Sequence, residues 1–333
     1  MSATGSLFGL AYGDSMGKPT EFQRFEEIVR EYGPAGPSDL PRGALVTDDT
    51  QMALAVAEAL LEQPAGAGPE PEALTTSLIK HFVAWAHSPD NNRAPGMTCL
   101  RACDGLAQGL PWAQATQRGS KGCGANMRVT PVALMPGLAP ATAAGIAQLQ
   151  AALTHGHATG LAASDLTAFA THLLLTGTAP ADLVPALRER CHEQRAVYHG
   201  TWLGDELWRV PGRQSPEDFI AAGWDECAAV LDRLAAALTR PDRDADPCRA
   251  TGEGWIAEEA LATALLCFLM YPDEPVRALG RAAATSGDSD SIAALAGAFA
   301  GARLGMAAFP PEWADRIEYR DRLARAGAAW DRP

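Results

Sequence analysis

Apolar residues recur at intervals of three and four through most of the 333-residue chain, with alanine filling many of the positions between them. This spacing is that of one face of an α-helix, and no stretch of useful length alternates apolar and polar residues as a half-buried β-strand does. The pattern therefore predicts an all-α fold. The expected helices lie at about residues 5–16, 21–31, 49–62, 72–87, 96–108, 141–154, 160–176, 180–192, 217–238, 256–270, 274–284, 291–305 and 313–327.

Acidic residues gather before two of these helices and near the N-terminus. The three segments read TDDTQMALAVAEAL from Thr47, SGDSDSIAALAGAFAGARLG from Ser286 and GLAYGDSMGKPTEF from Gly9. One such segment is explained by capping, because a hydroxyl accepts a backbone N–H and each carboxylate favours the helix dipole by about 0.3–1 kcal/mol. Three in one chain favour a shared site. Its candidate side chains are Asp14, Glu21, Thr47, Asp48, Asp49, Asp288, Asp290 and Ser291.

These side chains offer only oxygen atoms as ligands, with no histidine or cysteine among them. Oxygen donors suit Mg²⁺, Ca²⁺ or Mn²⁺ rather than Zn²⁺. Several carboxylates in one cleft repel each other unless cations lie between them, so we expect one or two divalent ions. In a two-ion site the cations lie roughly 3.5–4 Å apart and share a carboxylate.

Breaks rich in proline and glycine interrupt the helices after Glu62, Val210 and Thr239. Each break is short enough to be a surface loop. The acidic segments stand on both sides of all three, so a shared site would make residues 1–333 a single domain. Within the last acidic helix, glycines recur every four residues, at 297, 301 and 305. Glycine inside a helix costs about 0.5–1 kcal/mol, so we predict that a second backbone packs closely there, behind the site.

Composition narrows the function classes. The net charge is −13, and hydrophobic residues make up 47% of the chain. An acidic chain lacks the positive surface with which proteins hold nucleic acid, so no such partner is expected. The seven cysteines form no CxxC pair, which suits a reducing cytoplasm. We see no signal peptide, and the longest apolar run, ALATALLCFLMY from Ala260, predicts a buried helix rather than a membrane span.

A glycine-rich segment, QRGSKGCGANMR, begins at Gln117. Such a segment can turn backbone N–H groups toward a phosphate, with Lys121 supplying charge, or it can be a flexible loop. It lacks the order of residues found in a Walker A motif. Two further segments, APGMTCLRAC and LTHGHATG, offer Gly96, Thr98 and His155 to a ligand. Capping of a helix by Thr98 and a structural role for His155 are the alternatives.

In this order along the chain, GLAYGDSMGKPTEF, TDDTQMALAVAEAL, GSKGCGANMRVTPVAL, LTHGHATG, GEGWIAEEALATAL and GDSDSIAALAGAFAGARLG resemble the ADP-ribosylglycohydrolase family. The resemblance runs from about Gly5 into the tail PPEWADRIEYRDRLA. It implies a compact, single-domain orthogonal helical bundle with two Mg²⁺ or Mn²⁺ ions and a cleft for ADP-ribose. The implied activity is hydrolysis of the bond between ADP-ribose and an acceptor on a protein or small molecule, releasing ADP-ribose. The arginine side chain of an ADP-ribosylated protein is the first expectation, and a catalytically silent ADP-ribose-binding or immunity protein is the alternative.

The resemblance also implies roles for single residues. The implied metal ligands are Thr47, Asp48, Asp49, Asp288, Asp290 and Ser291. The implied substrate contacts are Gly96, Thr98, Gly119, Ser120, Lys121, Gly122, Cys123, Gly124 and His155. Glu21 matches the family's acidic residue near the substrate, and Glu21, Asp49 or Asp290 could take the proton of the attacking water.

Three positions depart from the family pattern. Ser291 stands where many members have threonine, which keeps the hydroxyl. Cys123 replaces a polar residue in the glycine-rich segment, which matches the family's phosphate-binding loop, and Asn126 stands where a small residue is common. These departures affect the ligand preference rather than metal binding.

Overall fold

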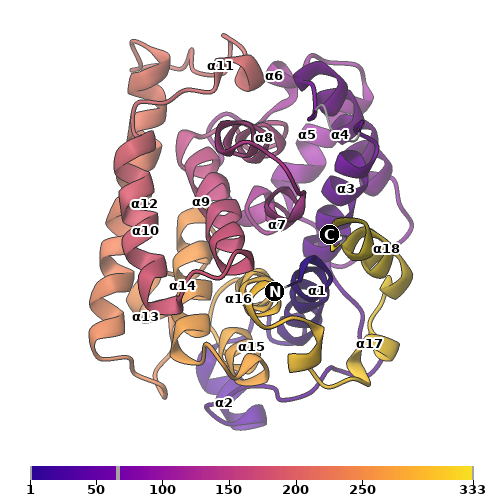
Figure 1. Cartoon of the computed structure of the whole chain (residues 1–333), viewed down its shortest axis with the longest axis vertical. Coiled ribbons are helices and arrows are strands. Elements are labelled where there is room, and N and C mark those ends of the chain that lie inside the picture. Colours follow the sequence, from indigo (N-terminus) through magenta and orange to yellow (C-terminus); the bar gives the residue numbers. More distant parts are fainter. Residues whose placement is uncertain (1, 65–67, 332–333) are drawn as a thin grey trace.

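The computed structural model describes residues 2–64 and 68–331. Within these ranges the chain forms helices and no β-strand; its isolated bridges there pair Gln117 with His155 and Gly122 with Ile256. The all-α prediction is confirmed (Figure 1). The break expected after Glu62 includes residues 65–67, which lie outside the described ranges.

The helices of eight residues or more are α1 Ala3–Gly17, α2 Phe25–Tyr32, α3 Asp48–Leu61, α4 Pro71–Ala86, α5 Met97–Ala107, α8 Pro140–Ala152, α9 Ala158–Leu175, α10 Pro180–Gln194, α12 Pro216–Thr239, α14 Ala257–Met270, α15 Pro275–Ala283, α16 Ser289–Leu304 and α18 Arg320–Trp330. The shorter elements are α6 Trp112–Ala115, α7 Thr130–Leu134, α11 Gly200–Leu203, α13 Cys248–Thr251, α17 Trp313–Arg316 and the 3₁₀ turns η1 Cys123–Ala125 and η2 Met306–Ala308. The sequence pattern does not predict α6, α7, α11 or α13, because four or five residues are too few to show a helical period.

The prediction of one helix at residues 313–327 is wrong, because the helical conformation is interrupted between α17 and α18. Tyr319 adopts a left-handed conformation with φ 57°. The break lets the Glu318 carboxylate accept the Val46 N–H at 3.0 Å and pair with both terminal nitrogens of Arg93, at 2.6 and 2.9 Å. These contacts fix the chain directly before α3.

The helix expected at residues 21–31 begins later, at Phe25. Phe22 has a φ of 66°, a left-handed conformation that a helix cannot continue. Residues 20–23 form a turn in which the Gln23 N–H donates to the Thr20 carbonyl at 3.0 Å. Glu21 therefore lies on a turn rather than in a helix.

Helices α1 and α16 lie antiparallel in the middle of the molecule, backbone against backbone (Figure 1). A β-carbon added to Gly9 would lie 2.1 Å from the Gly297 carbonyl oxygen, and one added to Gly17 would lie 2.4 Å from the Asp290 Cα. The close packing predicted for the glycines of α16 is confirmed, and α1 supplies the matching glycines. This pairing brings the end of α1 to the start of α16.

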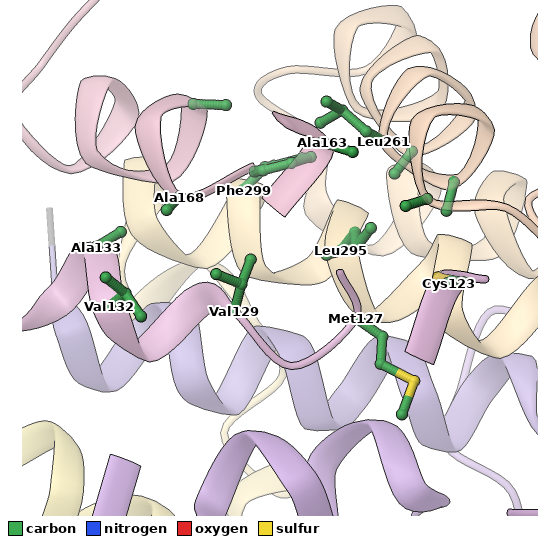
Figure 2. Close-up of a cluster of buried hydrophobic side chains, with 14 of the residues drawn as sticks. Cys123, Met127, Val129, Val132, Ala133, Ala163, Ala168, Leu261, Leu295 and Phe299 are labelled. Carbon is green, nitrogen blue, oxygen red and sulfur yellow. The ribbon is translucent and has the colours of Figure 1, made fainter. Parts of the chain in front are cut away.

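The main buried cluster runs between α16 and the elements that cover it (Figure 2). In that view Cys123 lies at one end of the cluster, Leu295 in the middle, and Val132 and Ala133 at the other end. A continuous apolar core therefore holds together α1, α3, η1 and α16, the elements that carry the acidic and glycine-rich segments. No helix in the described part of the chain has the length and apolar character needed to cross a membrane.

Candidate functional site

Acidic side chains meet where α1 ends and α3 and α16 begin. Because α1 and α16 are antiparallel, the turn that carries Glu21 lies beside the first turn of α16. One carboxylate oxygen each from Glu21, Asp288 and Asp290 lies within 4.8 Å of the others. Glu21 is half-buried, and the two aspartates are buried. The structure thus joins two acidic segments that lie more than 260 residues apart, as Glu21 and Asp288 show.

The third acidic segment is attached through Asp14, a fully buried residue of α1. Its carboxylate accepts the N–H and the hydroxyl of Thr47 at 2.9 Å each, and the N–H and the hydroxyl of Thr50 at 3.0 and 2.5 Å. Asp14 therefore caps the start of α3 from a neighbouring helix. The sequence pattern marks Asp14 as acidic but not as the residue that positions α3, because capping across helices leaves no local spacing.

Thr47 is the N-cap of α3, and its hydroxyl oxygen accepts the Asp49 N–H at 3.4 Å. The predicted capping role of Thr47 is confirmed. Asp48 accepts the Gly96 N–H at 3.0 Å, which brings the start of α5 to the start of α3. Among the described residues, the buried Oδ1 atom of Asp49 has no hydrogen-bond partner. An unpaired buried carboxylate oxygen is a ready ligand for a cation.

Burial and mutual repulsion shift these carboxylates strongly toward their protonated forms. Burial first, and then the charge of Asp290, raises the pKa of Asp14 to about 7 and that of Glu21 to about 9. Burial is also the main cause that raises the pKa of Asp48 to about 7 and the pKa values of Asp49 and Asp288 well above their ordinary range. A divalent cation bound among these carboxylates would supply the missing positive charge and favour their ionised forms.

The first turn of α16 completes the acidic cluster. Asp290 accepts the Ser291 N–H at 3.0 Å, and the buried Ser291 hydroxyl contacts the Met127 sulfur at 3.8 Å. The Asp288 N–H donates to the Glu253 carbonyl at 2.8 Å, so the segment before α14 lies against the cluster. The candidate ligand atoms of Glu21, Asp288 and Asp290 are carboxylate oxygens, a set that suits Mg²⁺ or Mn²⁺.

The glycine-rich segment lies beside this cluster. Cys123 donates its N–H to the Trp255 carbonyl at 3.0 Å, and the Ser120 and Thr98 hydroxyls lie 3.2 Å apart. A β-carbon on Gly124 would lie 2.9 Å from the Cys99 sulfur, so a larger residue there would push this part of the segment away from α5 or displace Cys99. The side chains of Thr98 and Ser120, with Arg101, Thr116, Arg118 and Gly119, line an open hollow of about 650 Å³.

Lys121 does not extend as a free cation. Its ammonium pairs with Glu226 of α12 at 2.6 Å and with Glu258 of α14 at 2.5 Å. The Lys121 carbonyl accepts the Ala257 N–H at 2.9 Å. The side chain thus fastens the glycine-rich segment to two helices.

His155 is buried behind the glycine-rich segment. Its Nε2 atom would lie 3.3 Å from a β-carbon on Gly122, and its Nδ1 atom lies 2.8 Å from the Thr154 hydroxyl. Burial first, and then the charge of Arg128, lowers the pKa of His155 to about 3. The ring is therefore neutral at physiological pH, able to exchange hydrogen bonds but not to supply positive charge.

Two exposed aromatic side chains stack beside the acidic cluster. The rings of Phe22 and Trp255 lie 5.6 Å apart with an angle of 18° between their planes. Phe22 is 67% exposed and directly follows Glu21, and Trp255 is 39% exposed. The sequence pattern does not single out this pair, since an exposed aromatic residue in a turn has no periodic signal.

Comparison with known proteins gives one consistent result. The ADP-ribosylglycohydrolase family model matches residues 2–332. The chain is 26% identical to the ADP-ribosylarginine hydrolase Tri1 of Pseudomonas putida (strain GB-1), covering 97% of this chain and 76% of that protein. It is 25% identical to the ADP-ribosyl-[dinitrogen reductase] glycohydrolase of Rhodospirillum rubrum, with 96% and 90% covered. It is 27% identical to human ADP-ribosylhydrolase ARH3, with 94% and 88% covered.

A solved structure described as an ADP-ribosylglycohydrolase-related protein complex has the same fold. It superimposes with a TM-score of 0.67 at 24% identity and covers 98% of this chain and 96% of its own. The family match spans all three acidic segments and the glycine-rich segment. The chain therefore belongs to the ADP-ribosylglycohydrolase family.

Proposed function

We propose that this protein is a metal-dependent hydrolase that cleaves the bond between ADP-ribose and an acceptor side chain, acting as one domain over residues 1–333. The observation that carries the proposal is the meeting of Glu21, Asp288 and Asp290 beside the start of α3. Family membership supports ADP-ribosyl hydrolysis. The residues proposed to hold two Mg²⁺ or Mn²⁺ ions are Thr47, Asp48, Asp49, Asp288, Asp290 and Ser291.

When bound, the cations would supply positive charge that orients ribose hydroxyls and makes a water more acidic. The chain's own groups do the rest. Glu21 is half-buried while Asp288 and Asp290 are buried. Once the negative charge around it is balanced, its ionised carboxylate can take a proton from a water that attacks the anomeric carbon. Asp49 and Asp290 are the alternative bases. Asp14 acts behind them by holding α3 in place.

The glycine-rich segment is proposed to bind the diphosphate. The proposed contacts come from Gly119, Ser120, Gly122, Cys123 and Gly124, and turns of this kind bind anions. The proposed donors are the backbone N–H groups of the three glycines and the Ser120 hydroxyl, since the N–H groups of Ser120 and Cys123 already bond to the Gln117 and Trp255 carbonyls. Lys121 would add charge only by sharing its ammonium with Glu226 and Glu258. Gly96, Thr98 and His155 are proposed to line the rest of the ADP-ribose cleft.

Arginine is the proposed acceptor, and the Phe22–Trp255 stack supports it. A guanidinium binds over an aromatic face with about 0.5–2 kcal/mol. Phe22 directly follows Glu21 in the chain, so a leaving arginine would meet the stacked rings beside the acidic cluster. Two relatives are named for hydrolysis of ADP-ribosylarginine and of ADP-ribosyl-[dinitrogen reductase]. The proposed partner is accordingly a protein ADP-ribosylated on arginine.

We also propose a cytoplasmic location. The seven cysteines are free and buried. Free thiols persist in reducing compartments, which supports this location.

The first experiment measures release of free ADP-ribose from arginine-linked and serine-linked substrates, with Mg²⁺ and with a chelator. We expect metal-dependent release from the arginine-linked substrate. Asp290→Ala should abolish release while circular dichroism stays nearly unchanged. Asp182→Ala, which removes an exposed carboxylate from the first turn of α10, should keep full activity.

Other results would change the proposal. Full Mg²⁺-dependent turnover by Asp290→Ala would overturn the assignment of the site. Release from the serine-linked substrate alone would keep the hydrolase and overturn the arginine acceptor. Binding of ADP-ribose without release from either substrate would favour a silent ADP-ribose-binding protein.

A further inference from the structure

A second cavity, of about 430 Å³, lies away from the acidic cluster. Its walls come from α7, the loop after α7, the first half of α8, α9, α10 and α18. Figure 2 shows Val132, Ala133 and Ala168, which line it, at the far end of the buried cluster from Cys123. The proposed active site does not use it, and its size is that of a small-molecule pocket.

The lining is apolar except at one point. Apolar side chains from four elements face the space: Val132, Leu134, Met135, Leu138, Phe169 and Trp330. The charged side chains among the lining residues are Asp165 and Arg190, with His172 exposed at the edge. An apolar space with one ionic end fits a ligand that has an apolar body and one polar end.

Arg190 is 8% exposed, and its guanidinium group lies 4.2 Å from the centre of the Phe169 ring. Its Nε–H donates to Asp165 Oδ1 at 2.6 Å. Among the described residues, its Nη1 and Nη2 groups make no hydrogen bond. The second oxygen of Asp165 accepts from Gln148 Nε2 at 3.2 Å, so this carboxylate is shared between Arg190 and Gln148.

The guanidinium thus offers its two terminal NH₂ groups to the cavity, where an acceptor on a ligand could bond to both. The guanidinium fork matches a planar carboxylate, which can accept from both terminal nitrogens at once. The apolar walls would then cover the rest of the ligand. We propose that this cavity binds an apolar monocarboxylate, such as a medium-chain fatty acid, with its carboxylate on Arg190.

The test is calorimetric titration of the full chain with octanoate, 1-octanol and octylammonium, which share one alkyl chain and differ in the end group. We expect saturable binding of one octanoate per chain. 1-Octanol should bind roughly ten- to hundredfold more weakly, since it loses charge-assisted hydrogen bonds, and octylammonium should not bind. Equal affinity for octanoate and 1-octanol, or no saturable heat with millimolar octanoate, would overturn the proposal.

Variants on one helix locate the binding. Ala143 and Ala141 both lie on α8, but only Ala143 lines the cavity, and Ala141 is exposed. Ala143→Trp should fill part of the cavity and abolish octanoate binding, and Ala141→Trp should leave it unchanged. Octanoate binding that survives Ala143→Trp at full affinity would contradict this location.

Arg190→Gln tests the ionic end. If this variant folds, it should bind octanoate no better than 1-octanol, and a retained preference for octanoate would contradict the role of Arg190. The variant removes the partner of the buried Asp165, so its folding is checked first by circular dichroism. The Ala143→Trp result decides the location whether or not Arg190→Gln folds.

Discussion

Asp14 and Thr47 are joined twice: the Asp14 carboxylate accepts both the backbone N–H and the hydroxyl of Thr47, each at 2.9 Å. Asp14 lies on α1, whose backbone also packs against α16. One buried carboxylate therefore sets the start of α3 relative to the start of α16. The proposed metal ligands lie at these two helix starts, so their spacing depends on Asp14.

Asp14→Asn is expected to loosen this connection. An amide offers one acceptor oxygen and one donor group in place of two acceptor oxygens, so some of the N–H and O–H groups of Thr47 and Thr50 lose their partner. With saturating Mg²⁺, we expect a loss of about 1–3 kcal/mol in unfolding free energy and weaker Mg²⁺ binding. Urea unfolding and Mg²⁺ titration measure both. Asp104→Asn, at an exposed position of α5, is the control, and a variant indistinguishable from it would refute the positioning role.

The acidic cluster predicts an unusual pH dependence for the metal-free protein. The pKa of Asp48 rises from 3.8 to about 7 and that of Glu21 from 4.5 to about 9, mainly through burial. At a pH between the ordinary and the raised pKa of such a group, the folded chain holds more protons than the unfolded chain. The unfolding free energy therefore falls as pH rises through this range. We expect the melting temperature in chelator to fall from pH 5 to pH 8, and Mg²⁺ to remove most of that fall. A flat or rising profile in chelator would be inconsistent with the cluster.

Lys121 and Glu258 are expected to be coupled in stability. The side chain of Glu258 is only 6% exposed, and Lys121→Met removes the ammonium that pairs with its carboxylate. We expect a loss of about 1–3 kcal/mol, recovered in large part by Lys121→Met with Glu258→Gln. Urea unfolding of the single and double variants measures the coupling. Strict additivity would show that the pair does not fasten the glycine-rich segment.

The same variants test how the phosphate is held. Because the Lys121 ammonium is already paired with two carboxylates, we expect Lys121→Met to lower ADP-ribose affinity by less than tenfold. Isothermal titration with ADP-ribose measures it. A much larger loss, not recovered by Glu258→Gln, would make the ammonium a main phosphate contact.

The fold class was predictable because helical spacing is a local property of the sequence. The break between α17 and α18 was not, since Glu318 leaves the helical pattern to bind Val46 and Arg93, which lie more than 220 residues away. The turn at Phe22 is similar: its left-handed conformation is not marked by the apolar spacing. Local pattern predicts where a helix can form, and distant contacts decide where it stops.

The acidic site was predictable in part, for a related reason. Two carboxylates in a first turn can be read from TDDT and DSDS, and their order matches the family. The capping of α3 by Asp14, the ion pairs of Lys121 and the open guanidinium of Arg190 depend on which helices are neighbours. Spacing along one helix carries no information about such neighbours.

The last prediction concerns the glycine contact between α1 and α16. In a helix, alanine is normally favoured over glycine by about 0.5–1 kcal/mol, so Gly→Ala usually stabilises. At Gly9 the sign should reverse, because the new β-carbon would lie 2.1 Å from the Gly297 carbonyl oxygen and two packed backbones must separate. We expect a loss of about 1–3 kcal/mol in urea unfolding.

Gly160→Ala is the matched control, since its β-carbon would meet its nearest neighbour at 3.7 Å, an ordinary contact, inside α9. This variant should be neutral or slightly more stable. Separating α1 from α16 should also move Glu21 away from Asp290, so Gly9→Ala should weaken Mg²⁺ binding although Gly9 lies two helical turns before Gly17. Equal stability of the two alanine variants would mean that the helices can move apart freely, and the register that assembles the acidic cluster would then need another cause.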